Sequence, residues 1–215
     1  MSTTPGSEPA GEPGSDRGVD GAPLALRRLR EGNERRRAGN LRAVSYAPPG
    51  SRPADGQWPV AAILTCADSR VLPEQVFDLA SGTLFTVRNA GNVVNDEVLG
   101  SLEFATGDLS LPLILVLGHT HCAAVAAAAQ TVRTGEDGGS WRAVSVAKIV
   151  PAIVGAPPDA DLRCLVWRNA TASAQQIQQR SEPIAARVAR GQVRIATAVL
   201  DLATGAVQWT DPGWS

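Results

Sequence analysis

The sequence predicts an α/β protein with a mostly parallel sheet of four strands, an antiparallel edge strand and helices on both faces. Four short apolar segments have the length of strands: residues 59–66, 83–87, 111–117 and 193–200. They lack the alternation of apolar and polar residues that a half-exposed strand shows, so we expect them to be buried on both faces. Helical segments separate them along the chain, and this order is typical of parallel sheets.

The first part of the chain divides into a tail, a helix and a connecting arm. Residues 1–22 are rich in Gly, Pro, Ser, Asp and Glu, which predicts a disordered tail before a folded domain at 23–215. Residues 24–40 predict an Arg-rich amphipathic helix, and residues 44–58 a connecting arm. The Arg run is typical of either a nucleic-acid patch or a solvated or subunit-packing face, and interleaved glutamates favour the second interpretation.

The other elements follow from the remaining apolar pattern. Helices are expected between these strands, at residues 73–80, 95–106, 122–133, 140–153 and 172–190. A turn at residues 203–205 then precedes a short segment, 206–209, which we expect to be the antiparallel edge strand.

Composition excludes several classes of protein. The 215 residues include 20 basic and 21 acidic side chains, and this balance predicts neither a nucleic-acid nor a membrane-surface partner. No apolar run approaches the roughly 20 residues of a membrane span. The N-terminus lacks a secretory layout, and three Cys are too few for a disulfide scaffold. We therefore expect a cytoplasmic protein.

Potential metal ligands gather at the ends of two predicted strands. Cys66 ends the first strand, and His119 and Cys122 follow the third. Ligands of parallel sheets sit beyond the carboxyl ends of the strands, and adjacent strands lie about 5 Å apart. Two thiolates and one imidazole suit zinc, and three protein ligands leave one position open for water. For Cys66 alone, a small buried apolar residue is an equally good interpretation, and Cys164 is interpreted in that way.

Three further polar side chains lie close to these cysteines and histidine. Asp68 can bind a metal or accept a hydrogen bond from metal-bound water, and Arg70 offers a planar fork that holds a carboxylate. The alternative is a surface ion pair of little energetic consequence. His121 is interpreted as a surface histidine in preference to a proton shuttle.

These motifs resemble those of the β-class carbonic anhydrases. The first is Cys-x-Asp-x-Arg, here Cys66, Asp68 and Arg70, and the second is His-x-x-Cys, here His119 and Cys122. Residues 87–92 and 101–104 resemble the segments that link the two motifs in the family. The resemblance covers about residues 24–209 and is specific because several motifs occur together.

The resemblance implies an enzyme and a chemistry. It implies that Cys66, His119 and Cys122 bind Zn2+, and that a metal-bound hydroxide hydrates carbon dioxide to bicarbonate. It implies that Asp68 orients this hydroxide and that Arg70 holds Asp68 away from the metal, since Asp68 closes the site as a fourth ligand in part of the family. It also implies a homodimer or a higher homo-oligomer.

The sequence departs from the family pattern beside the site and leaves other functions open. Ala123 stands where the family usually has Gly after the second zinc cysteine. Ile63 and Leu200 replace the Trp and Tyr of a bicarbonate-sensing pocket, so that pocket is not predicted. The alternatives are a hydrolase of carbonyl sulfide or carbon disulfide, a non-catalytic zinc-stabilised interaction domain, and redox sensing by the two motif cysteines.

Overall fold

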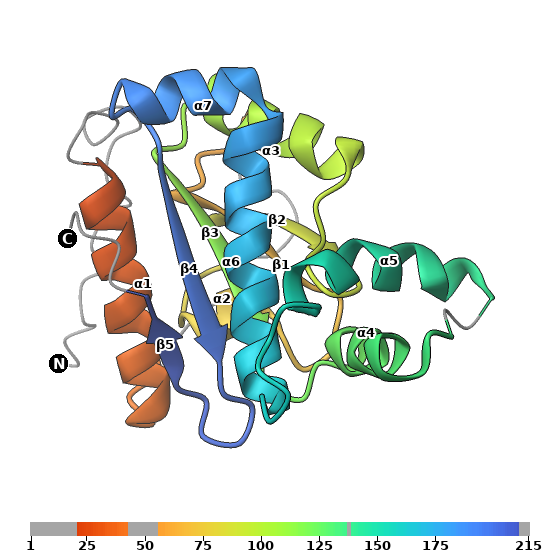
Figure 1. Ribbon diagram of the computed structural model, residues 1–215. Helices are drawn as coiled ribbons and strands as arrows, with labels where there is room; N and C mark the ends of the chain where they lie inside the picture. The colour runs from red at the N-terminus through yellow and green to blue at the C-terminus, as the bar shows by residue number, and fades with distance from the viewer. Residues whose placement is uncertain (1–20, 43–55, 137–138, 211–215) are drawn as a thin grey trace, which may run out of the picture.

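The computed structural model describes residues 21–42, 56–136 and 139–210 (Figure 1). A five-stranded sheet has the order β2-β1-β3-β4-β5, in which the first four strands are parallel and β5 is antiparallel to β4. The predicted fold class is confirmed. The strands are β1 (Ala61–Cys66), β2 (Leu84–Asn89), β3 (Leu113–His119), β4 (Arg194–Leu200) and β5 (Val207–Trp209).

Helices cover both faces of the sheet. They are α1 (Gly21–Arg37), α2 (Pro73–Val76), α3 (Asp96–Gly107), α4 (Ala123–Thr134), α5 (Trp141–Ile153), α6 (Leu162–Arg180) and α7 (Glu182–Ala189). Among the described residues, no helix combines the length and apolar character that a membrane span requires.

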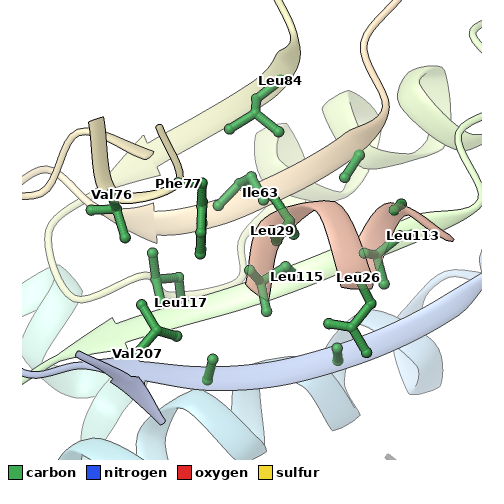
Figure 2. Close-up of a cluster of buried hydrophobic side chains, with 14 of the residues drawn as sticks. Leu26, Leu29, Ile63, Val76, Phe77, Leu84, Leu113, Leu115, Leu117 and Val207 are labelled. Carbon is green, nitrogen blue, oxygen red and sulfur yellow. The ribbon is translucent and has the colours of Figure 1, made fainter. Parts of the chain in front are cut away.

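Alternate side chains of the two central strands belong to different hydrophobic layers. Ile63 and Leu115 face α1, whose Leu26 and Leu29 cover this side of the sheet, as Figure 2 shows. Ala62, Leu64, Ile114 and Val116 face α3 and α6 on the other side. Both faces of β1 and β3 are therefore dry, which explains why their sequences are apolar without alternation.

The strands end within two residues of the expected positions, and the differences have local causes. The third strand begins at Leu113 because Pro112 has no N–H for the ladder, and it extends to His119, which pairs with Leu200. The second strand extends to Asn89, which pairs with Cys66. The extensions bring His119 of the second motif, and Asn89 of the segment that links the motifs, into the sheet.

The helices differ more from the expectation. The predicted helix at 172–190 is two helices, since Ser181 caps α7 by accepting a hydrogen bond from Ile184 N–H, and Pro183 lies in the first turn. The longer helix, α6, begins ten residues before the predicted start, where the Asp161 carboxylate accepts from Cys164 N–H. The helix predicted at 73–80 is a single turn, α2, which Asp78 follows with φ +49°.

The N-terminal boundary also shifts. The first helix begins at Gly21, so Gly21 and Ala22, expected in the tail, are helical and buried. Residues 1–20 of the predicted tail, and all of the predicted arm before residue 56, lie outside the described residues.

Candidate metal centre

Three buried side chains from two strand ends and one helix start form a candidate metal site. Cys66 is the last residue of β1, His119 the last of β3, and Cys122 precedes the first turn of α4. Their ligand atoms all lie within 4.8 Å of one another, and the two sulfur atoms are 4.0 Å apart. The three side chains thus converge although 56 residues separate the cysteines.

His119 presents one ring nitrogen to this cluster in the state that metal binding requires. Its Nδ1 lies 2.9 Å from the carbonyl oxygen of Thr120, which can only accept a hydrogen bond, so Nδ1 carries the proton. The other nitrogen, Nε2, is buried and has no hydrogen-bond partner among the described residues. A lone pair without a partner in a dry site fits a metal ligand, and the backbone carbonyl fixes the ring as an outer partner does in metal centres.

The close contact of the two cysteines shifts their pKa values in opposite directions. Their hydrogen bond lowers the pKa of Cys66, and a hydrogen bond from Gly91 N–H to Cys66 Sγ (3.3 Å) acts in the same direction. The contact with Cys66, together with burial, raises the pKa of Cys122. A cation would relieve this coupling by binding both sulfurs as thiolates, and a set of two sulfurs and one imidazole nitrogen suits zinc.

Asp68 and Arg70 form a two-pronged ion pair at the edge of the cluster. Arg70 Nε donates to Asp68 Oδ1 at 2.9 Å, and Nη2 donates to Oδ2 at 2.7 Å. These bonds hold the pKa of Asp68 well below its usual range. Oδ2 also lies 4.0 Å from His119 Nε2, so the carboxylate is between Arg70 and the ligand set. The Asp68 side chain is only 16% exposed, unlike that of a free surface pair.

Arg88 is a further residue of the site, and the sequence analysis did not single it out. Its Nε donates to the carbonyl oxygen of Cys66 at 3.2 Å, and its Nη2 donates to that of Asp68 at 2.8 Å. One guanidinium thereby ties Cys66 of the candidate ligand cluster to the ion pair. The signal was available only through the parallel register, in which Arg88 pairs with Thr65, the residue before Cys66.

Other residues considered in the sequence lie outside the ligand cluster. His121 is exposed and has φ +58°, and Ala123 is exposed at the start of α4. Cys164 is only half-buried in α6, so its interpretation as a small buried residue is not confirmed. Among the described residues, only Cys66, His119 and Cys122 form a metal-binding group of His, Cys, Asp or Glu.

Comparisons with known proteins decide the family. A family model described as carbonic anhydrase matches residues 61–207, which is more than half of the chain. The chain belongs to the carbonic anhydrase family. Carbonic anhydrase 2 of Mycobacterium tuberculosis is 36% identical over 184 residues, covering 84% of this chain and 89% of the relative. A carbonic anhydrase of Mycolicibacterium smegmatis is 34% identical over 187 residues, covering 86% and 91%.

Solved structures place this carbonic anhydrase in the β class. A Coccomyxa β-carbonic anhydrase in complex with acetazolamide is 26% identical, with a TM-score of 0.65 over 87% of this chain and 84% of the other. Tetrameric β-carbonic anhydrases of Sordaria macrospora share the fold at 18% identity, with a TM-score of 0.65 over 73% and 82%. The sequence resemblance is confirmed, and the class consists of lyases whose general reaction is carbon dioxide hydration.

Proposed function

We propose that this chain catalyses the zinc-dependent, reversible hydration of carbon dioxide to bicarbonate. One observation carries the proposal: the ligand atoms of Cys66, His119 and Cys122 converge within 4.8 Å, beside a carboxylate that Arg70 holds. The three residues would hold the zinc ion, while Asp68 and Arg70 would act on the reacting groups. When bound at such a site, zinc lowers the pKa of a water molecule to about 7 and so supplies a nucleophile at neutral pH.

Asp68 would orient the nucleophile by accepting its hydrogen bond. A carboxylate has about four lone-pair positions, and Arg70 uses only part of them. Because Arg70 keeps the pKa of Asp68 well below its usual range, the group is an acceptor and not a donor at neutral pH. Arg70 also fixes the carboxylate through two bonds at 2.9 and 2.7 Å, so that Asp68 stays in place between one turnover and the next.

An apolar wall beside the ligands suits a small nonpolar substrate. Val93 is buried in the same hydrophobic cluster as Cys66 and Cys122. The valine side chain offers no hydrogen bond that would compete with the reacting groups, so it suits contact with carbon dioxide. Phe77 is not part of this wall, because it is fully buried in the core beneath α1, where its ring lies 6.0 Å from that of Trp209.

The test combines metal analysis with stopped-flow hydration of the wild type and Asp68→Asn. We expect about one zinc per chain in both proteins, and a hydration rate at least about 100-fold lower in Asp68→Asn. Asp96→Asn is a matched control, because Asp96 has the same 2.7 Å contact with an arginine Nη2 on a different part of the surface. A wild type that binds zinc and does not hydrate carbon dioxide would overturn the proposal and leave a zinc-stabilised domain.

The same assay distinguishes carbon dioxide from sulfur-containing substrates. Carbonyl sulfide and carbon disulfide undergo the same first attack at carbon, so the ligand set does not separate them. We expect the wild type to prefer carbon dioxide when rates are measured side by side. A large preference for carbonyl sulfide would replace the proposed reaction with its hydrolysis.

We also propose that the enzyme is a cytoplasmic homodimer or higher homo-oligomer. Strand β2 lies at one edge of the sheet, and the 43% exposed Phe104 packs against Phe85 of this strand, with ring centroids 6.1 Å apart. The β-carbonic anhydrases of Sordaria macrospora are tetramers, which supports an oligomer here as well. Light scattering of Phe104→Glu against the wild type tests it, and a monomeric wild type would refute it. A reducing compartment would keep Cys66 and Cys122 available as ligands.

A further inference from the structure

The loop at residues 89–93 passes directly beside the ligand Cys66. Its Gly91 N–H donates to Cys66 Sγ at 3.3 Å, in a buried position. Asn89 closes the loop on itself, since its side chain accepts from Val93 N–H at 2.9 Å and donates to Val93 O at 2.8 Å. The loop therefore contributes a hydrogen bond to a metal ligand without supplying a ligand of its own.

Two buried polar side chains of α6 hold the middle of this loop. Asn169 Nδ2 donates to the carbonyl oxygen of Gly91 at 2.9 Å, and Ser173 Oγ donates to that of Asn92 at 3.0 Å. Each side chain is only 3% exposed. The two residues are four positions apart, so they lie on the same face of the helix. Helix α6 thus binds two consecutive carbonyl groups of a loop about 80 positions away in the sequence.

The backbone of this loop needs such external bonds. Gly91 has φ +80° and Asn92 has φ +45°, so two consecutive residues adopt the left-handed conformation. That conformation is unfavourable for a residue with a side chain, and it persists where surrounding contacts determine it. The direction of the Gly91 N–H depends on these backbone angles. The bonds from Asn169 and Ser173 therefore act on the bond to Cys66 Sγ.

We propose that Asn169 and Ser173 are positioning residues for the metal ligand Cys66, acting through the Gly91 N–H. They hold the loop so that this N–H points at the sulfur, which fixes the Cys66 side chain relative to His119 and Cys122. The inference rests on the proposed zinc site and assigns a role in it to two buried residues of α6. Partners outside the ligand set tune the affinity and electronic state of a bound metal in this way.

The test measures metal binding in Asn169→Ala and Ser173→Ala. Zinc affinity is determined by competition with a chromophoric chelator, and the sulfur-to-metal charge-transfer absorption is recorded on the Co²⁺-loaded proteins. We expect zinc to bind about tenfold more weakly in each variant, and the charge-transfer band to shift because the sulfur loses a hydrogen bond. A role in folding alone would lower stability without moving that band.

Two control variants remove the same kinds of buried side-chain group, an amide and a hydroxyl, at positions outside the loop and α6. Asn33→Ala removes a buried amide that donates to Val76 and Gly205 carbonyl groups, and Ser181→Ala removes a buried hydroxyl that donates to Glu103. We expect both controls to lose stability and to keep the wild-type zinc affinity and Co²⁺ spectrum. Should Asn169→Ala fail to fold, Ser173→Ala decides the matter, since it deletes one oxygen atom.

The outcomes separate this inference from the function on which it rests. A wild type that binds no zinc overturns both. A wild type that binds zinc and hydrates carbon dioxide, with Asn169→Ala and Ser173→Ala indistinguishable from their controls in affinity and spectrum, overturns only the positioning role.

Discussion

Arg70 and Asp68 meet through two parallel hydrogen bonds, from Nε to Oδ1 at 2.9 Å and from Nη2 to Oδ2 at 2.7 Å. The oxygen Oδ2 that accepts from Nη2 is also 4.0 Å from His119 Nε2, which has no hydrogen-bond partner in the described part of the chain. The arginine therefore holds the carboxylate beside the candidate ligand cluster. Under the proposed function, this geometry would make Arg70 the residue that decides whether Asp68 assists the reaction or blocks it.

We expect Arg70→Ala to lower hydration by at least about 100-fold and to keep zinc bound. Without the guanidinium, Asp68 is free to turn toward the cluster and become a fourth ligand, which closes the position that water needs. X-ray absorption of the zinc-loaded variant should show a carboxylate oxygen in the ligand shell. Arg180→Ala, which frees another carboxylate, that of Asp96 on α3, and also removes a bond to the Val94 carbonyl oxygen, is the control and should keep full activity. An active Arg70→Ala enzyme would contradict the role.

The pH profile of hydration should not contain the titration of Asp68. The hydrogen bonds from Arg70 depress the pKa of Asp68 below the ordinary value of about 3.9. The ionised carboxylate therefore stabilises the folded protein at neutral pH, and this contribution is lost only in strong acid. Between pH 6 and 9 the group is ionised throughout. We therefore expect the rates of Asp68→Asn to lie below those of the wild type by a constant factor over this range. A wild-type inflection that disappears in Asp68→Asn would show that Asp68 titrates there.

The hydrogen bond from the loop to Cys66 Sγ depends on the glycine at position 91. We expect Gly91→Ala to lower the free energy of unfolding by more than the roughly 1–2 kcal/mol of left-handed strain, and to weaken zinc binding. At φ +80°, an added Cβ would lie 2.7 Å from Ile149 Cδ1 and 3.1 Å from Ala124 Cβ, so the Ile149 side chain must turn away and the loop or α4 must give by a few tenths of an ångström. Thermal unfolding and zinc competition measure the two effects.

Gly135 provides the control for this substitution. It ends α4 with φ +74°, and an added Cβ would meet nothing within 4 Å. Gly135→Ala thus carries a similar backbone strain without crowding, and we expect it to destabilise the protein and leave zinc affinity unchanged. Equal zinc affinities in Gly91→Ala and Gly135→Ala would mean that the loop does not act on Cys66.

The sequence predicted that Cys66 and His119 lie at the same edge of the sheet because both end apolar strands. Cys66 and His119 each follow a run of buried residues, and the carboxyl ends of parallel strands lie on one edge of a sheet. The adjacency of β1 and β3, which brings the two ends together, is a property of the strand order and came only with the structure.

The residues around the ligands could not be predicted in this way. Asn169 and Ser173 are ordinary polar residues of a helix, and the segment before them, residues 162–166, resembles a short strand in composition. Their partners are two backbone carbonyl groups about 80 residues away, and a carbonyl group leaves no mark in the sequence. A residue that acts on the main chain is identified by the fold alone.

Arg88 offers a final test of how the site is held. We expect Arg88→Ala to lower hydration by about tenfold or more, because its guanidinium donates to the carbonyl oxygens of both Cys66 and Asp68 and so fixes the ion pair relative to the ligands. Lysine at this position should restore little, since one ammonium group cannot reproduce the fixed fork. Stopped-flow rates and zinc content measure the effect.

The matched control for Arg88 is Arg168→Ala. Arg168 Nε also donates to a backbone carbonyl, that of Ala152 at 3.1 Å, but this bond joins α6 to α5 and involves neither Cys66 nor Asp68. We expect its loss to leave the hydration rate unchanged. If the two variants have the same rate per bound zinc, the link between Cys66 and Asp68 does not contribute to activity, and the position of the carboxylate is then determined by Arg70 alone.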